Sequence, residues 1–306
     1  MAVYVPAYYS RFRCVAADCS HTCCAGWEIG IDEQTLGVYQ NMTGPLGEAI
    51  RASLVVREDG ACFATDKHGR CAHLDSRGLC RIIAEVGEGA LCHICREHPR
   101  FYHTVMGHTV CGLGAVCETA AELILHEPDD TTLVCLDAKA PPLALDDAAT
   151  SPHAALFAAL KNDAAPFGVR LAEITQTFAG GVVLPPREWR RLFASLEYLD
   201  KKDKRRFGRA WRLATQKTWQ ERSPEVALFA ERFLAYLFLR HVVPEEGGRE
   251  TCLAVAASLV LLRVFLALLE MGLAPVIAAR TVSEELEYSE DNMEAIRFAL
   301  DLQLLG

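Results

Sequence analysis

The run Leu91-Cys92-His93-Ile94-Cys95-Arg96-Glu97-His98-Pro99-Arg100 decides how this chain is divided. It closes a region, residues 12–100, that holds nine of the thirteen cysteines in less than a third of the sequence. Thiolates are soft ligands, and a Cys-x-x-Cys pair brings both sulfurs within reach of one metal centre. The sequence therefore predicts a metal or iron–sulfur site in the first part of the chain, with the bulk of the apolar core in the rest.

Eight cysteines are candidate metal ligands: Cys14, Cys19, Cys23, Cys24, Cys71, Cys80, Cys92 and Cys95. Adjacent cysteines point in different directions, so the vicinal pair is expected to serve different partners, and eight candidates are enough for two sites. Spacing does not decide between zinc and an iron–sulfur cluster, because both take four thiolates. Four other cysteines are better explained as small buried residues: Cys62, Cys111, Cys135 and Cys252.

Length, cysteine usage and charge limit the classes of protein to which the chain can belong. The chain has 306 residues, enough for two domains, and its first residues lack the basic and apolar segments of a secretory signal. An odd number of cysteines and a vicinal pair favour reduced, metal-binding thiols over disulfides, so a cytoplasmic location is expected. The net charge of −9 argues against nucleic acid as the main partner, although it is compatible with a local basic patch.

Helical periodicity dominates the second half. Apolar residues recur at helical spacing in residues 152–162, 169–178, 186–199, 206–216, 223–242, 251–271 and 283–305. We therefore expect a mainly α protein, in which an irregular cysteine-rich metal-binding domain, residues 1–136, packs on an all-α helical bundle, residues 153–306. The Pro-, Ala- and Asp-rich residues 137–152 form the expected linker. The first domain is expected to contain short helices and a small hairpin with strands at 100–105 and 108–111.

The most apolar run, residues 252–276, is expected to be a buried helix. Arg263 and Glu270 interrupt it. Its longest uncharged piece, residues 251–262, falls well short of the roughly 20 residues that a bilayer requires. No membrane span is therefore expected.

The cysteines lie within longer patterns that extend over nearly the whole chain. The first half contains Phe12-x-Cys14, Cys19-x-x-x-Cys23-Cys24-x-Gly26-Trp27, Gly69-x-Cys71-x-x-Leu74, Leu79-Cys80-x-Ile82, Leu91-Cys92-x-x-Cys95-Arg96-x-x-Pro99-Arg100 and Cys117-Glu118-x-Ala120. The second half contains Glu231-Arg-Phe-Leu-Ala-Tyr236, followed by Arg240, and Ser283-x-Glu285-Leu-Glu287-Tyr-Ser289-x-x-Asn292. This set of patterns resembles the flagellin lysine-N-methylase family. The first half is also similar to the zinc- or iron-chelating Cys-x-x-Cys-x-x-Cys-Cys domains.

The resemblance implies a function and a set of site residues. The function is methyl transfer from S-adenosylmethionine to lysines of flagellin or another protein substrate, with the cysteines holding an iron–sulfur cluster of the 4Fe–4S type or, alternatively, zinc. The implied catalytic residues are Glu285, Glu287, Asn292 and Arg240. The implied cofactor-binding residues are Trp27, Arg96, Arg100 and Tyr236.

The chemistry of lysine methylation sets what such a site must do. A lysine amine attacks a methyl sulfonium only when it is neutral, so the site needs a base or a desolvating pocket that lowers the lysine pKa from about 10.4. Glu285 and Glu287, two positions apart on a helix, point to different faces, and a solvent-exposed acidic face is the simpler explanation of both. The alternative function is a non-catalytic zinc- or iron-chelating or redox-sensing protein with a helical partner-binding domain.

Overall fold

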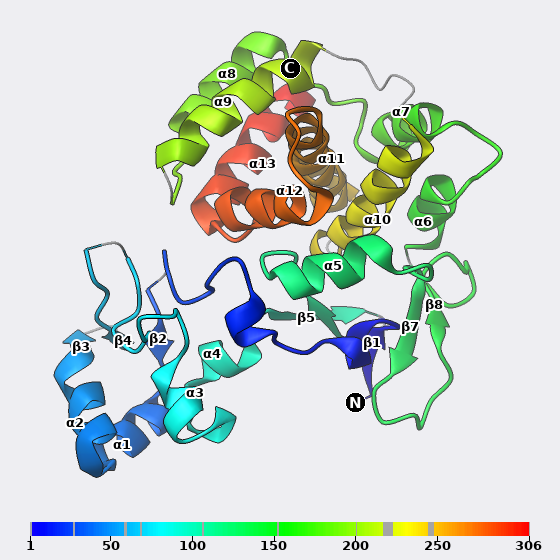
Figure 1. Ribbon diagram of the computed structural model, residues 1–306. Helices are drawn as coiled ribbons and strands as arrows, with labels where there is room; N and C mark the ends of the chain where they lie inside the picture. The colour runs from blue at the N-terminus through cyan, green and yellow to red at the C-terminus, as the bar shows by residue number, and fades with distance from the viewer. Residues whose placement is uncertain are drawn as a thin grey trace. The chain divides into compact units, whose positions relative to one another are not determined.

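The computed structural model describes residues 2–26, 28–57, 60–67, 69–105, 107–151, 153–199, 201–216, 223–243 and 248–305. By its internal contacts the chain divides into a larger unit, Met1–Phe12 with Arg100–Gly306, and a smaller unit, Arg13–Pro99 (Figure 1). Helices predominate among the elements of the described residues, which confirms the expected mainly α class.

This division differs from the boundary expected at residues 137–152. The first strand, β1 (Val3–Pro6), pairs with β6 (His108–Leu113) and β7 (Thr132–Cys135), so backbone hydrogen bonds tie both ends of the expected first domain to the larger unit. The expected linker contributes β8 (Leu143–Ala144) to the same sheet.

The sheet of the larger unit has the order β5-β6-β1-β7-β8. Strand β5 (Arg100–Val105) pairs antiparallel with β6, which confirms the predicted hairpin. Strand β1 runs parallel to β6, with Tyr4 opposite Val110, and antiparallel to β7. Helix α5 (Glu118–His126) connects β6 to β7 and packs against two later helices of the same unit, α10 and α12.

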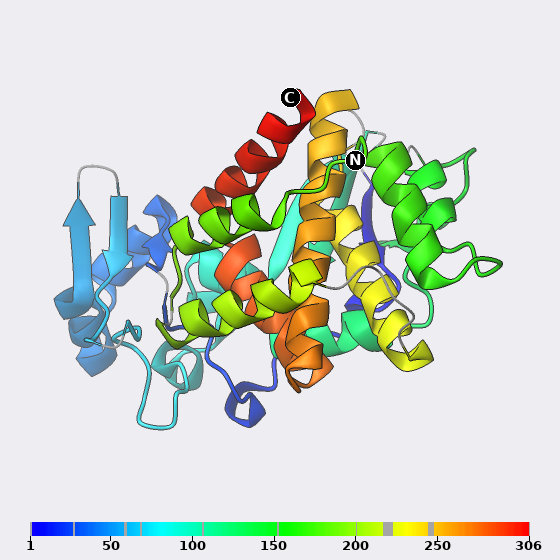
Figure 2. The ribbon, with the colours of Figure 1, turned by 90° about the horizontal axis from the view of Figure 1, so that it is seen from above.

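The predicted helices of the second half are present. They are α6 (Ala154–Leu160), α7 (Phe167–Phe178), α8 (Pro186–Ser195), α9 (Lys201–Gln216), α10 (Pro224–His241), α11 (Gly248–Glu270) and α13 (Glu290–Leu305). A further helix, α12 (Pro275–Val282), was not predicted. Helix α11 is central, since it packs against α7, α9, α10, α12 and α13 (Figure 2). By length and composition α11 could cross a membrane, but 83% of its most apolar window is buried inside the protein. It is therefore a core helix, as expected for this run.

The single helix predicted for residues 283–305 is broken. A π-helical turn, η5 (Ser283–Glu287), continues from α12, and α13 begins only at Glu290. Ser283 has the sequence of a helix start, but the cap is Ser289, whose hydroxyl accepts a hydrogen bond from the backbone N–H of Asn292 at 3.2 Å. A π turn widens the backbone and is frequent at functional sites.

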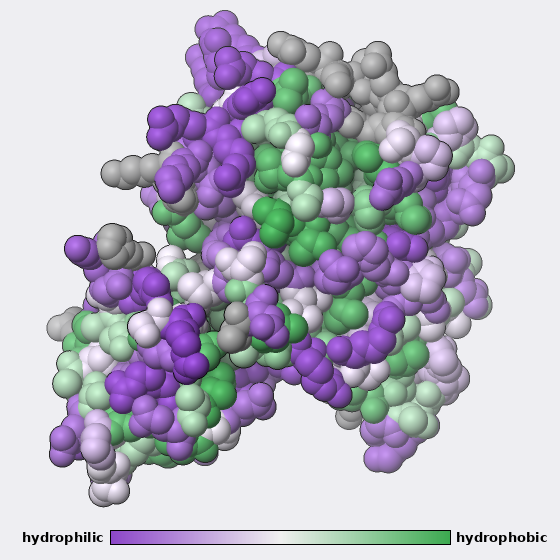
Figure 3. Space-filling view, in the orientation of Figure 1, coloured by the Kyte–Doolittle hydropathy of each residue, from purple (hydrophilic) through white to green (hydrophobic). Residues whose placement is uncertain are grey.

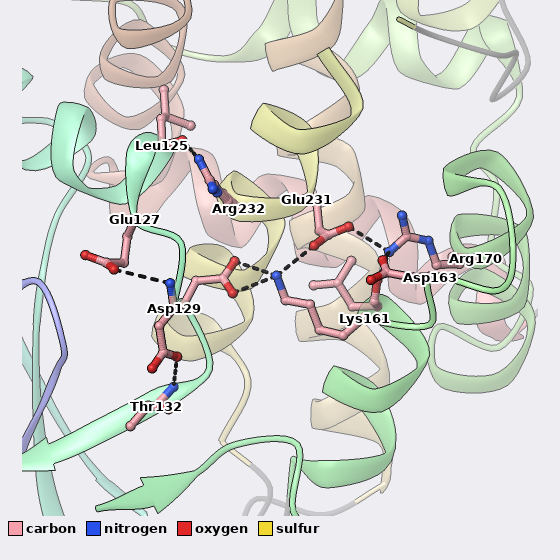
Figure 4. Close-up of polar contacts among 11 residues, drawn as sticks. Leu125, Glu127, Asp129, Thr132, Lys161, Asp163, Arg170, Glu231 and Arg232 are labelled. Atoms are coloured by element: carbon pink, nitrogen blue, oxygen red, sulfur yellow. Dashed lines mark hydrogen bonds and ion pairs between the residues drawn. The ribbon is translucent and has the colours of Figure 1, made fainter. Parts of the chain in front are cut away.

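A buried ion network joins α6, α7 and α10. Lys161 Nζ lies 2.6 Å from Asp130 Oδ1 and 2.8 Å from Glu231 Oε1, and an Arg170 guanidinium nitrogen lies 2.7 Å from Glu231 Oε2. Figure 4 shows Lys161 and Arg170 on either side of Glu231. Both carboxylates are almost fully buried, so the two cations are needed to hold them there.

The smaller unit has its own core around a short sheet of order β2-β4-β3. Its strands are β2 (Gly30–Ile31), β3 (Leu54–Arg57) and β4 (Gly60–Phe63). Its helices are short: η2 (Ala16–Asp18), α1 (Glu33–Asn41), α2 (Gly44–Ser53), α3 (Arg81–Glu85), η3 (Glu88–Ala90) and α4 (His93–Glu97). Tyr39 and Ile50 are fully buried at its centre.

Candidate functional site

Five thiols gather in the core of the smaller unit. Cys71 and Cys92 are buried members of that core, and Cys24, Cys80 and Cys95 pack against it. These five are among the eight predicted metal ligands. Cys14 and Cys19 flank η2 and are not part of this core, and Cys23 is exposed. All thirteen cysteines lie in the described residues, and each is a thiol rather than half of a disulfide.

Asp32 fixes the helix that carries the Cys-x-x-Cys pair. Its Oδ2 accepts a hydrogen bond from the backbone N–H of His93 at 2.8 Å, and its Oδ1 accepts one from Thr35 at 2.9 Å. The two bonds hold the pKa of Asp32 down at about 2. Asp32 therefore caps α1, and the same carboxylate also positions the first turn of α4, where Cys92 and Cys95 lie.

Hydrogen bonds between thiols separate their pKa values. The Cys95 thiol donates to Cys92 and lowers the pKa of Cys92 to about 7. The Cys24 thiol lowers the pKa of Cys23 to about 7 in the same way. The pKa of Cys95 is raised by its bond to Cys92, by burial and by the negative charges of Cys92, Cys71 and Cys80. One thiol of each pair is therefore poised to ionise near neutral pH.

The thiols are gathered but not arranged around a common point. Within the described ranges, no three His, Cys, Asp or Glu side chains are placed as the ligands of a metal ion. All five sulfurs are soft donors, and two of them, Cys92 and Cys95, are paired by a hydrogen bond.

A second polar centre lies in the larger unit around Glu287. Tyr236 donates its hydroxyl hydrogen to Glu287, with Oε1 at 2.7 Å and Oε2 at 2.9 Å. Arg240 Nε lies 3.0 Å and His241 Nε2 2.9 Å from Oε1, and Ser283 donates to Oε2. Three of these donors come from α10, and Ser283 comes from the same π turn as Glu287. The break in the predicted helix thus aims this carboxylate at α10.

Burial makes this carboxylate unlike a surface acid. Glu287 is 5% exposed and Glu285 is 3% exposed, so the explanation of both as a solvated acidic face is wrong. Burial alone would raise the pKa of Glu287, but the charge of Arg240 and the bonds from His241 and Ser283 lower it to about 2. Glu287 is therefore ionised at neutral pH.

His241 takes its protonation state from this neighbour. Since Glu287 is ionised and can only accept, Nε2 of His241 carries the hydrogen that bonds to it. Burial lowers the pKa of His241 below its ordinary 6.5, against the opposing effect of Glu287. The imidazole is therefore neutral, with its hydrogen on Nε2 and its lone pair on Nδ1, and the pair has the chemistry of a carboxylate-oriented base. His241 was not predicted from the sequence, although it directly follows the predicted Arg240.

Arg240 is held between two rings. Its guanidinium lies 4.2 Å from the ring centroid of Tyr288 and 4.9 Å from that of Phe101, and it donates to the Tyr288 hydroxyl at 2.9 Å. Gly114 lies against this group, because a Cβ there would collide with the Tyr288 hydroxyl and the guanidinium. The backbone N–H of the next residue, Ala115, donates to Tyr236 at 3.0 Å. The β6–α5 connection thus closes one side of the centre.

Glu285 and Asn292, two of the predicted catalytic residues, bond to the backbone of residues 197–199. Glu285 Oε2 accepts a hydrogen bond from Leu199 N at 2.8 Å, and Asn292 bonds the backbone N–H and C=O of Glu197. Asn292 also donates to the carbonyl of Glu285. These side chains anchor the connection between α8 and α9. Glu285 and Glu287 point in different directions, as predicted.

The predicted cofactor-binding residues are dispersed. Trp27 lies outside the described residues. Arg96 is on the exposed side of α4 in the smaller unit. Arg100 opens β5 and donates to the Tyr9 hydroxyl at 2.8 Å, while its guanidinium lies over the rings of Tyr9 and Phe12. Tyr236 is the predicted cofactor-binding residue that the structure bonds to Glu287.

Comparison with known proteins gives partial matches. No family model matches the chain, and no solved structure matches it. The chain is 29% identical over 139 residues to a "Flagellar biosynthetic protein FliU" of Salmonella muenchen, a match that covers 44% of this chain and 82% of that protein. It is 29% identical over 139 residues to a "Lysine-N-methylase" of Salmonella typhimurium and 28% identical to one of Salmonella choleraesuis. The match spans only 35% of each of these methylases.

Proposed function

We propose that this protein is a cytoplasmic lysine N-methyltransferase that transfers methyl groups from S-adenosylmethionine to lysines of flagellin. The names of the similar proteins support the reaction and the flagellar substrate. The observation that carries the proposal is the 2.9 Å contact between His241 Nε2 and Glu287 Oε1 in a buried centre. It supplies a neutral base, one of the two means by which the acceptor lysine can lose its proton.

The centre accounts for activation of the acceptor. A lysine ammonium brought beside His241 is desolvated and repelled by the charge of Arg240, and both effects lower its pKa. His241 Nδ1 takes its proton, and Glu287 stabilises the imidazolium that forms. The lysine nitrogen then attacks the methyl carbon, the carbon–sulfur bond breaks, and the neutral thioether leaves with the bonding electron pair. Tyr236, Ser283 and Arg240 hold the carboxylate in place throughout.

We further propose that the thiol core of the smaller unit binds an iron–sulfur cluster of the 4Fe–4S type or, alternatively, zinc. The number of soft donors supports this proposal, because the core has five thiols and either group requires four. Binding would have to draw the sulfurs around one centre, since no three of them are placed as metal ligands within the described residues. Cys71, Cys80, Cys92 and Cys95 would be the ligands, with Cys24 beside them. A bound cluster would supply Lewis-acid or redox chemistry, and ligation would stabilise the fold of the smaller unit.

The second candidate function is a non-catalytic metal-binding or redox-sensing protein. The two thiol pairs favour it, because a thiol with a pKa of about 7 beside another thiol is readily oxidised. Anaerobic purification with metal analysis identifies the bound group. Iron with acid-labile sulfide supports the cluster, whereas stoichiometric zinc without iron leaves binding of S-adenosylmethionine to separate the two candidate functions.

Calorimetric titration of the metal-replete protein with S-adenosylmethionine under anaerobic conditions tests the proposal. We expect saturable binding at one site per chain. If no heat of binding is measured, the methylase proposal fails and the second candidate is preferred.

A further inference from the structure

The helices α8 and α9 carry a strong local positive charge in an acidic protein. Together they contain ten Lys and Arg residues and two acidic residues, a contribution of +8 to a chain of net charge −9. The rest of the chain therefore carries −17. Figure 3 shows hydrophilic side chains gathered over this pair of helices, in the upper left of the view.

The two helices direct these charges outward because their apolar faces are buried. The Phe193 and Trp211 rings stack at 4.9 Å, and the Trp189 and Trp211 centroids lie 4.1 Å apart. Exposed basic residues then follow one face of α9 at spacings of three and four residues: Lys202, Arg205, Arg209 and Arg212. At 1.5 Å per residue this stripe is about 15 Å long. Arg187, Arg190 and Arg191 are exposed on α8.

This basic surface is fixed to the segment that carries Glu287. The connection between the two helices is bonded at Leu199 to Glu285, two residues before Glu287, and at Glu197 to Asn292. Helix α9 packs on α11, and α8 packs on α13. A partner bound to the basic surface is thereby held at a constant position relative to the Glu287 centre.

We propose that α8 and α9 form a docking surface for an acidic region of the protein substrate. This inference rests on the proposed function only in naming the substrate as the partner. Among the described side chains of the two helices, no large apolar group is exposed, so nothing inserts into a lipid surface or stacks on bases. Nucleic acid carries charge continuously along its length. A nucleic acid would therefore extend beyond the 15 Å stripe onto the rest of the protein, whose net charge is negative and would repel it. An acidic patch on a protein can match the stripe in length.

The test compares two variants with the same change in net charge. Arg205→Glu with Arg209→Glu reverses the centre of the stripe, and Lys67→Glu with Lys139→Glu reverses exposed charges elsewhere. Binding of a fluorescent peptide of alternating glutamate and alanine is measured by anisotropy without methyl donor. We expect the first variant to weaken binding about tenfold and the control to leave it unchanged. Binding should also weaken with added salt. Thermal unfolding checks that both variants are folded.

The same variants are then assayed with flagellin, for which the first should raise KM and the control should not. Equal peptide affinity of the two variants would overturn the docking proposal. So would tighter binding of duplex DNA or anionic vesicles that depends on Arg205 and Arg209, or self-association that the first variant abolishes. Failure of the methylase proposal is seen separately, as absence of methylation in the wild type while peptide binding persists.

Discussion

Replacement of Glu287 by Gln tests the energetics of the buried centre. Folding lowers the pKa of Glu287 from 4.5 to about 2. That difference of about 2.5 in pKa corresponds to roughly 3–4 kcal/mol of stability, because a change of one in pKa is worth about 1.4 kcal/mol. Removing one partner of a buried ion pair costs a similar amount, about 3–5 kcal/mol. The variant keeps the size of the side chain but leaves Arg240 without its carboxylate, so a loss of about 3 kcal/mol at pH 7 is expected.

The sign of the pH dependence follows from the lowered pKa. The stabilisation by Glu287 is fully present above its unfolded pKa of 4.5 and is lost as pH falls toward about 2. The gap between wild type and variant should therefore be constant from pH 7 to 5 and shrink below 4.5. Guanidinium denaturation, followed by the fluorescence of the buried Trp189 and Trp211, measures it. Glu290→Gln, at an exposed neighbour, is the control and should change stability by less than about 0.5 kcal/mol. Wild-type stability of Glu287→Gln at pH 7, or a gap that does not shrink in acid, would refute this account of the centre.

Three further predictions follow from the contacts described. His241→Asn should slow methylation by about 100-fold. The wild-type rate should fall as pH drops through a His241 pKa that lies below 6.5, and an acid limb above 6.5 would argue against this base. Replacing Cys71, Cys80 or Cys92 by Ser should strip metal and unfold the smaller unit, while Cys252→Ser keeps full metal content. Full metal occupancy in all three of the first set, measured by elemental analysis, would contradict the ligand assignment. Lys161→Met should cost about 3–5 kcal/mol in chemical denaturation, because Asp130 and Glu231 lose their shared cation, whereas Lys139→Met at an exposed pair should cost less than about 1 kcal/mol.

The helices of the larger unit could be predicted because each buries one apolar face, and that face recurs in the sequence at helical spacing. The break after Glu287 could not, since Ser283 with its two following acids has the composition of a helix start. Strand β1 was also missed. Its four residues gain their stability from strands about a hundred positions away, and no local pattern records such pairing.

Part of the candidate site could be predicted from the sequence, and the rest depends on contacts between residues that are distant in the chain. Cysteine spacing indicated the thiols of α4 and its surroundings, but not that Cys14 and Cys19 lie apart from their core. Glu287, Arg240 and Tyr236 were named through a resemblance, and the structure brings them into contact. His241 could not be predicted, because its partner Glu287 lies 46 residues further along the chain. The two side chains meet only because the π turn η5 directs Glu287 toward α10. The reason for glycine at position 114, close approach to Tyr288 and Arg240, is visible only in three dimensions.

Mass spectrometry of flagellin tests the central claim most directly. Metal-replete protein, prepared anaerobically, is incubated with S-adenosylmethionine and flagellin of the same organism. We predict that wild type and Glu290→Gln add mass to lysine residues in steps of one methyl group, and that Glu287→Gln and His241→Asn do so far more slowly while retaining their metal. Unchanged flagellin mass with the metal-replete wild type, or equal rates in all four proteins, would contradict the account.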